Sequence, residues 1–115
     1  ELKPIFSKKN LISLFNKTKR LKNYSLTSFH EKNLINLYKL NKKLSLGLIF
    51  SPHTKMKTFK IKSKKKFIKL FVVKKKFLTY DKLDALNIPI YYYTTKCKNT
   101  FNKYKNSKNL IFENL

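Results

Sequence analysis

The sequence predicts an α+β fold of the ferredoxin-like βαββαβ type, with two helices on one face of an antiparallel-rich sheet. Two segments place apolar residues at helical spacing, and short β-rich runs flank these segments in the matching order. Hydrophobic residues make up 42% of the 115 positions and aromatic residues 15%, enough for one modest core. We expect a domain at 21–96, a basic N-terminal extension at 1–20 and a basic C-terminal tail at 97–115.

The first half of the chain contains two predicted helices around a strand. Residues 7–20 place Leu11, Leu14 and Phe15 on one side of a basic helix, and "LKNYSLTSF" (21–29) has the composition of a strand. Ser28 and Glu31 then stand at capping-box spacing before "EKNLINLYKLNKKL", whose leucines recur at helical intervals. This segment predicts the first helix of the domain.

Gly47 follows that helix, where a glycine makes a chain reversal easy. "LGLIF" (46–50) is a short apolar strand, and Pro52 forces the residue before it out of the helical region, so Ser-Pro-His is an extended or turn segment. From Phe59 the pattern has period two, with lysines on one side, so residues 59–71 predict a basic β-hairpin arm. Its apolar phase slips at residues 67–68, which indicates a bulge.

The second half predicts one more helix and one more strand. "KKKFLTYDKLDALN" (74–87) offers four apolar residues for the inner face of a helix, and "IPIYYYTT" (88–95) is β-rich. Alternation in that strand requires Tyr92, or else its two neighbours, to face the core. The polar tail from Lys96 onward is expected to wrap a partner or lie over a surface.

The net charge is the strongest functional signal in the composition. Lys and Arg number 28 against 5 Asp and Glu, which gives +23 at pH 7, so the chain needs a polyanion to offset its self-repulsion. A folded, basic, aromatic-bearing small domain indicates nucleic-acid binding, and RNA in particular. Arg20 is the only arginine, and lysine favours phosphate contacts over base readout. The residue usage indicates an AT-rich gene, as in many organelles.

The inventory for catalysis and metal binding is nearly empty. Asp81 and Asp84 share one helical face, but on so basic a chain we expect them to pair with lysines. His30 and His53 are the only histidines and lack a Cys or carboxylate cluster, and the single Cys97 cannot form an internal disulfide. We expect no enzymatic activity, cofactor, metal or small-molecule substrate. No apolar run reaches membrane-span length.

Three separated segments resemble the small-subunit ribosomal protein ten family. They are Ser-Pro-His (51–53) leading to "FKIKSKKKFIKLF" (59–71), then "LTSFHEKNL" upstream and "LDALNIPIYYY" downstream, covering residues 22–96. Unlike bacterial members, this chain has a short arm before Ser51 and a trimmed loop after His53.

The resemblance implies a structural constituent of the small-subunit head that binds ribosomal RNA and neighbouring head proteins. It places the chain in mitochondria, favoured over a plastid-type organelle. The residues expected to contact RNA are those of the tip and the arm: His53, Lys55, Lys57, Lys60, Lys62, Lys64, Lys65 and Lys66. The chain has no acidic residue between Lys32 and Tyr80, which favours phosphate binding over a merely solvated face.

Two alternatives stay open from the sequence. One is a different basic RNA-binding or ribosomal protein. The other is a protein that binds anionic membrane surfaces, although the most basic segment has period two rather than an amphipathic helical period.

Overall fold

The computed structural model describes residues 1–113 of the chain. A five-stranded sheet contains β1 (Leu26–Ser28), β2 (Leu46–Ile49), β3 (Leu70–Lys74), β4 (Ile90–Thr95) and β5 (Asn109–Phe112). The helices are α1 (Lys8–Thr18), α2 (Glu31–Leu40), α3 (Met56–Lys62), the 3₁₀ helix η1 (Lys75–Thr79), α4 (Asp81–Asp84) and α5 (Lys98–Tyr104). From β1 onward, strands and helical segments therefore alternate.

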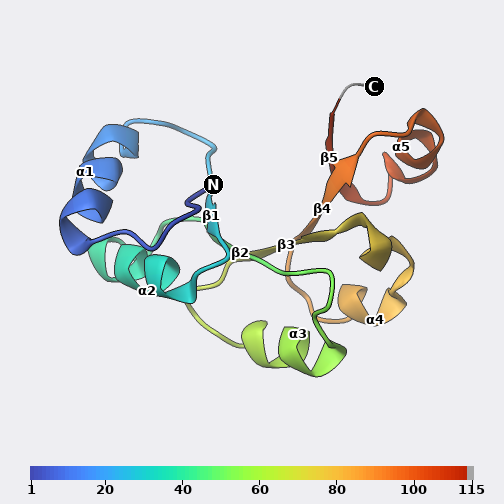
Figure 1. The fold of residues 1–115 in the computed structure, drawn as a ribbon, viewed down its shortest axis with the longest axis horizontal. Helices are drawn as coiled ribbons and strands as arrows, with labels where there is room; N and C mark the ends of the chain where they lie inside the picture. Colours follow the sequence, from blue (N-terminus) through green and yellow to red (C-terminus); the bar gives the residue numbers. More distant parts are fainter. Residues whose placement is uncertain (114–115) are drawn as a thin grey trace.

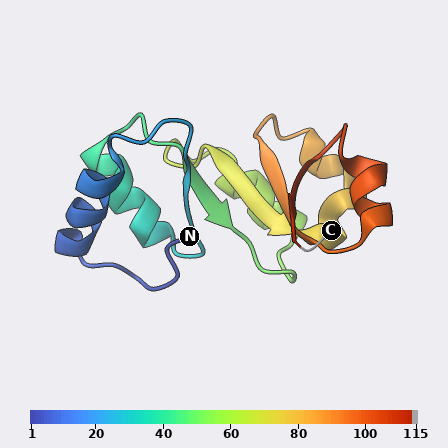
Figure 2. The same cartoon turned by 90° about the horizontal axis from the view of Figure 1, so that it is seen from above.

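The sheet is parallel throughout, and its strands lie in the order of the sequence. Each strand pairs in parallel with the next, from β1 to β5. The arrows of β2 and β3 point the same way in Figure 2. The prediction of an antiparallel-rich ferredoxin-like fold is therefore wrong, and the fold class is α/β. In a doubly wound sheet the strand order reverses near the middle, whereas a consecutive order is that of α/β barrels.

The helices form an outer arc around an inner arc of strands (Figure 1). One face of the sheet is covered by this arc, and the other face is concave and carries a smaller apolar cluster. The two ends of the sheet, β1 and β5, do not meet. Within residues 1–113 the sheet is thus open and is not closed into a barrel.

The central strands have the composition that a parallel sheet requires. All four residues of β2 are buried, as are the first four of β3, because side chains pack on both faces of these strands. An antiparallel sheet with one wet face would alternate buried and exposed positions instead. The continuous apolar runs "LGLI" and "LFVV" carried this signal in the sequence.

The predicted basic β-hairpin arm is not present. Its first half is helix α3 and a following turn, and only residues from Leu70 onward form a strand, β3. Met56 and Phe59 lie three residues apart on α3, and Phe59 is buried. Lysine is a good helix former, so its alternation with apolar residues did not by itself define a strand.

Other local predictions met mixed outcomes. The helices predicted at 7–20 and after Ser28 are confirmed as α1 and α2, and the strand at 88–95 is confirmed as β4. The helix predicted at 74–87 is split into η1 and α4. The tail does not lie free over a surface, because it adds α5 and β5 to the same sheet.

Gly47 does not reverse the chain but lies inside β2. A Cβ atom there would clash with the side chain of Leu70 on β3 and approach Cγ2 of Thr27 on β1 to 2.9 Å. Glycine at this position therefore lets three adjacent strands pack side chains over one another.

The main core lies between the sheet and the helices. Its centre is an aromatic group in which the ring of Phe59 lies 4.6 Å from Phe50, 5.9 Å from Phe71 and 5.2 Å from Phe77, measured between centroids. These rings join α3 and η1 to β2 and β3. A second, smaller cluster of Ile49, Leu70 and Val72 lies apart from this core, with Tyr93 packed against it.

Candidate functional site

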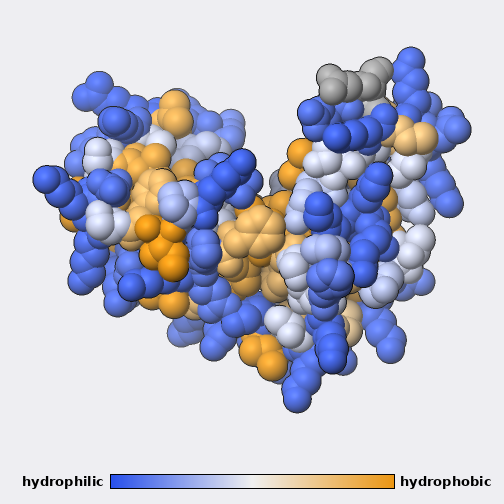
Figure 3. Space-filling view, viewed as in Figure 1, coloured by the Kyte–Doolittle hydropathy of each residue, from blue (hydrophilic) through white to orange (hydrophobic). Residues whose placement is uncertain are grey.

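The candidate site is a hollow on the concave face of the sheet. Figure 3 shows apolar side chains gathered in the recess between the two raised ends of the molecule. The hollow has a volume of about 290 Å³. Its lining comes from the N-terminus and from all five strands or the residues directly after them: Glu1, Thr27, Phe29, Ile49, Val72, Tyr93, Thr94 and Ile111.

Strand alternation explains why these side chains meet. Ile49 is in register with Val72, and Val72 is in register with Tyr91; two residues further along these strands, Lys74 is in register with Tyr93. The intervening residue Tyr92 points the other way and is buried in the main core. Because all the strands are parallel, their carboxyl ends lie at one edge of the sheet, where α/β folds bind their ligands.

Lys74 and Tyr93 form the polar part of this edge. The Nζ atom of Lys74 lies 4.8 Å from the centroid of the Tyr93 ring. The Tyr93 hydroxyl donates a hydrogen bond of 3.1 Å to the carbonyl oxygen of Phe50. Burial raises the pKa of Tyr93, and the negative charge of Glu1 raises it further. The hydroxyl therefore stays protonated, and Lys74 is held in place as a cation on the aromatic face.

Lys74 has no carboxylate partner among residues 1–113. Lys74 is partly buried and occupies the last position of β3. The two lysines that follow it in the chain, Lys75 and Lys76, are exposed. An ammonium group at the carboxyl edge of a parallel sheet without an internal counterion is suited to an external anion.

A buried polar network fixes the N-terminal segment beside this hollow. The Asn33 side chain accepts a hydrogen bond from the backbone N–H of Phe6 and donates to the carbonyl of Pro4 and to Ser28 Oγ, at 2.9, 2.8 and 3.2 Å. Ser28 Oγ in turn donates to the carbonyl of Leu2 at 2.7 Å. Glu1 reaches the hollow because this network holds the residues that follow it.

The same network replaces the capping box predicted for α2. The N-cap residue is His30, which makes no side-chain capping bond, and Ser28 Oγ accepts from the N–H of His30 instead. Glu31 forms an ion pair with Lys62 on α3. Lys62 is therefore the one predicted RNA contact that already has a carboxylate partner within the described chain.

The structure separates the other predicted RNA contacts into two groups. His53 and Lys55 lie in the loop between β2 and α3, at the carboxyl edge of the sheet. A turn in which Thr54 donates twice to the carbonyl of Ser51 leaves His53 exposed. Lys57 and Lys60 are exposed on α3, and exposed residues Lys64, Lys65 and Lys66 follow it toward the start of β3, at the opposite edge.

Phe29, which lines the hollow, and Lys74, which lies beside it, were not singled out from the sequence, whereas Tyr93 was considered there as a neighbour of Tyr92. Phe29 lies just beyond the carboxyl end of β1 and Lys74 at the last position of β3, whereas Tyr93 lies within β4. Their proximity depends on β1, β3 and β4 being parallel. A signal for them existed, since functional residues of α/β folds follow their strands, but it required the strand directions. The sequence predicted that either Tyr92 or its two neighbours face the core. The structure shows that Tyr92 does, with 1% of its surface exposed.

The sequence predicted that Asp81 and Asp84 each pair with a lysine, and the structure shows such a pair for Asp84. Asp84 forms an ion pair of 2.6 Å with Lys108, which lies in the tail just before β5. This bridge links α4 to the last strand. Asp81 is exposed in the first turn of α4.

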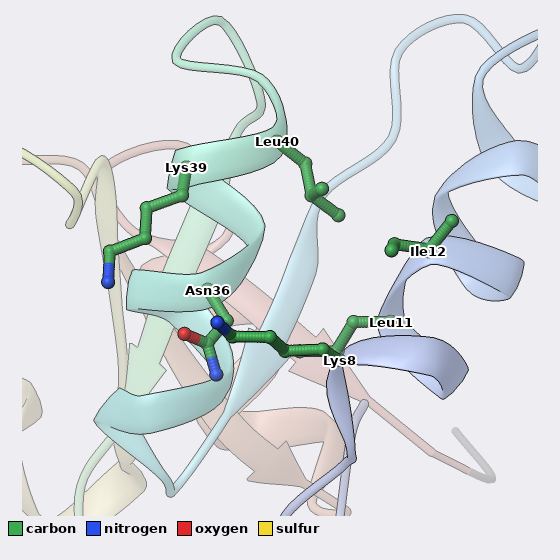
Figure 4. Close-up of a pocket in the computed structure, with 6 residues that line it drawn as sticks. All are labelled: Lys8, Leu11, Ile12, Asn36, Lys39 and Leu40. Atoms are coloured by element: carbon green, nitrogen blue, oxygen red, sulfur yellow. The ribbon is translucent and has the colours of Figure 1, made fainter.

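A second cavity lies between α1 and α2, with a volume of about 160 Å³. Figure 4 shows Leu11 and Ile12 facing Leu40 across it, while the Lys8 side chain extends toward Asn36. This cleft is apolar and lies on the outer arc, away from the carboxyl edge of the strands.

The described residues hold no group of three His, Cys, Asp or Glu side chains placed to bind one metal ion. None of the helices within residues 1–113 has the length and apolar character needed to span a bilayer.

The fold and the hollow define a class of protein: α/β proteins with an all-parallel sheet, here with a hollow on one face of that sheet. No protein-family model and no curated protein matches the sequence. A solved structure is similar, namely that of an Oleispira antarctica phosphodiesterase in complex with the product sn-glycerol-3-phosphate.

The likeness to this enzyme covers 91% of the chain but only 45% of the phosphodiesterase, with a TM-score of 0.69 and 12% sequence identity. The chain thus spans less than half the length of this neighbour. At this identity the match shows the fold alone. The chain shares its fold with part of an enzyme, so the fold lends no support to the expectation that enzymatic activity is absent.

Proposed function

We propose that this chain forms the phosphate-ester-binding part of an α/β barrel of the phosphodiesterase type. The observation that carries the proposal is Lys74 at the carboxyl edge of the sheet, an ammonium group without a carboxylate partner in residues 1–113, stacked on Tyr93 beside the concave hollow. The solved phosphodiesterase with the same fold holds sn-glycerol-3-phosphate, a phosphate monoester, as its product.

The chemistry of the hollow fits such a ligand. A phosphate group needs a cation and hydrogen-bond donors, and Lys74 supplies three N–H donors. A glycerol-sized body needs a small, partly apolar space, and the hollow of about 290 Å³ offers Ile49, Val72 and Phe29 as walls. Small-molecule sites combine such apolar walls with a few polar anchors.

The proposal assigns binding to this chain and no hydrolytic step. Glu1 is the one carboxylate that lines the hollow. A single carboxylate is too little for metal-assisted hydrolysis, in which several oxygen or nitrogen ligands hold the metal.

Titration of the nuclease-treated chain with sn-glycerol-3-phosphate, followed by NMR, tests this function. We expect shifts of the Lys74, Tyr93 and Thr94 amide signals, and a loss of affinity of at least tenfold in Lys74→Gln. Lys69→Gln is the matched control, because Lys69 precedes the same strand at its amino end and is exposed. Equal loss in both variants, or no saturable shift in the wild-type chain, would show that the site is not a phosphate-ester site.

A second candidate function is RNA binding, as in a small-subunit ribosomal protein, and the net charge of +23 favours it. Six of the predicted contacts are exposed lysines along α3 and its flanks: Lys55, Lys57, Lys60, Lys64, Lys65 and Lys66. Ribosomal RNA, neighbouring head proteins and a mitochondrial location belong to this candidate.

Salt dependence separates the two candidates. If six lysines neutralise phosphates of single-stranded RNA, log K should fall against log salt with a slope of about −4. Replacing Lys64, Lys65 and Lys66 together by Gln should then reduce that slope by about 2, while binding of sn-glycerol-3-phosphate should stay unchanged. A slope unaltered by the triple substitution would count against an RNA interface along α3.

A further inference from the structure

The cleft between α1 and α2 is a feature that neither candidate function uses. Both views of the fold place these two helices side by side at one end of the molecule (Figure 1 and Figure 2). Leu11 lines the cleft and is buried, whereas Ile12 and Leu40 on its two sides are exposed, at 45% and 39%. Two large apolar side chains therefore remain in contact with solvent across an apolar cleft (Figure 4).

The two helices that form this cleft are strongly basic. Lys8 and Lys39 line the cleft, and neither forms an ion pair within residues 1–113. Further exposed basic residues lie on these helices or directly after them: Lys9, Lys17, Lys19, Arg20, Lys22, Lys32, Lys42 and Lys43. The one acidic residue between positions 8 and 43 is Glu31, whose carboxylate already binds Lys62 on α3. The charge at this end of the molecule therefore suits an anionic partner.

We propose that the α1–α2 cleft docks the folded chain on an anionic membrane surface. Such a surface presents acyl chains and anionic headgroups together. Ile12 and Leu40 enter the boundary between headgroups and acyl chains. Lys8 and Lys39 lay their apolar stems along this boundary and place their ammonium groups among the headgroups.

The size and chemistry of the cleft favour a bilayer over other anionic partners. Ligand pockets in proteins have volumes of about 300–1,000 Å³, whereas this cleft has about 160 Å³. An acidic amphipathic helix binds through apolar anchors spread along a longer groove. Single-stranded RNA stacks its bases on aromatic rings, and none of the described residues that line the cleft is aromatic. A bilayer needs neither a deep pocket nor a stacking surface.

The structure also moves the membrane question to a different part of the chain. From the sequence, the most basic segment, 59–71, counted against membrane binding because its pattern has period two. Helix α1 is a basic element with an apolar side, on which Leu11 is buried and Leu14 and Phe15 are partly buried. Basic helices of this kind bind anionic interfaces. Here α2 covers much of that side, and Ile12 and Leu40 are left for the lipid.

This docking is independent of phosphate-ester binding, because it uses neither Lys74 nor the concave hollow. A chain with a net charge of +23 is attracted to anionic vesicles by charge alone. Vesicle binding by itself therefore does not identify the surface that binds. The contribution of Ile12 and Leu40 has to be measured against exposed apolar residues elsewhere on the molecule.

Flotation of the nuclease-treated chain with phosphatidylcholine vesicles, with and without about 30% phosphatidylserine, tests the proposal. We expect binding that requires the anionic lipid. At about 0.15 M salt, Ile12→Asn and Leu40→Asn should each weaken this binding by about fivefold or more. Ile61→Asn is the matched control, because Ile61 is exposed at 49% on the lysine-rich helix α3, and this variant should bind as the wild type does. Circular dichroism of each variant confirms that the helices are retained.

Paired lysine substitutions test the charged part of the surface. The double variant Lys8→Gln, Lys39→Gln should weaken vesicle binding more than Lys57→Gln, Lys60→Gln, although each removes two exposed positive charges. Lys74→Gln should bind vesicles as the wild type does. That result separates this surface from the proposed phosphate-ester site.

A wild-type chain that does not float with anionic vesicles at 0.15 M salt would overturn the proposal. Equal losses in Ile12→Asn and Ile61→Asn would do so as well, since they would show attraction by net charge alone. If Ile12→Asn weakens binding to polyuridine RNA or to polyglutamate as much as binding to vesicles, the cleft serves a polyanion and the proposal fails. A wild-type dimer that Ile12→Asn dissociates would assign the cleft to a second copy instead.

Discussion

Replacing Phe59 by Ala distinguishes the observed fold from the basic hairpin that the sequence predicted. In the structure Phe59 is 1% exposed and its ring packs against Phe50, Phe71 and Phe77. Truncating such a side chain removes buried apolar area and leaves a cavity, which costs about 3–5 kcal/mol of unfolding free energy. In a solvated hairpin arm the same change would cost within about 0.5 kcal/mol.

The assay is urea unfolding followed by circular dichroism at pH 7, on chain freed of nucleic acid. Lys60→Ala is the control, because Lys60 is the next residue on α3 and is exposed. We expect the control to lie within about 0.5 kcal/mol of the wild type. The slope of free energy against urea should be similar in all three chains.

A domain of this size has a total stability of about 5–15 kcal/mol, so Phe59→Ala removes a large part of it. If the variant is largely unfolded without denaturant, that result also supports the buried position. A loss below about 1 kcal/mol would refute the packing of α3 against the sheet, and with it the helical assignment of residues 56–62.

Three further substitutions test other parts of the molecule. Asn33→Ala removes three hydrogen bonds and leaves Ser28 with fewer partners, so urea unfolding should show a loss of about 2–4 kcal/mol. Gly47→Ala forces a clash with Leu70, and we expect a loss of about 1–3 kcal/mol in the same assay, whereas a neutral result would contradict the close strand packing. The Tyr92 hydroxyl is buried without a hydrogen-bond partner in the described chain, so Tyr92→Phe should be neutral or stabilising at pH 7. Burial, with a smaller contribution from Asp84, raises the pKa of Tyr92 from 10.0 to about 12, so the unfolded state releases this proton first. Stability should therefore fall between pH 10 and pH 12, by roughly 2–3 kcal/mol more in the wild type than in Tyr92→Phe, and equal losses would contradict the shift.

Several elements were predictable because their signals are local. The leucines of α2 recur at helical spacing within ten residues, and β4 is a β-rich run bounded by Pro89 and the polar tail. Tyr92 had to be buried, or its neighbours had to be, since alternation in a strand is a property of the backbone. Each of these signals depends on residues that are close in sequence.

The segment 56–67 was misread because its local signal is ambiguous. Lysines alternate there with Phe59 and Ile61, a pattern of period two, yet helix α3 buries Phe59 and leaves Ile61 exposed. The choice between strand and helix is decided by the rings of Phe50, Phe71 and Phe77, which come from other parts of the chain. Helical propensity and tertiary packing together outweigh alternation.

The candidate site could not be assembled from the sequence because its members are distant in the chain. Glu1, Phe29, Val72 and Tyr93 meet only when the strands are parallel and adjacent in sequence order. Strand direction is set by how the connecting helices pack back onto the sheet, and this is not a property of any one strand.

The sequence by itself determined the strongly basic charge, one modest core, and the positions of α1, α2 and β4. These follow from composition and from periodicity over a few residues. Only the tertiary structure decided that the sheet is parallel, that α3 is a helix, and that Lys74 and Tyr93 share one edge. The physical reason is that strand direction and burial are set by contacts between residues far apart in the chain, which no local pattern specifies.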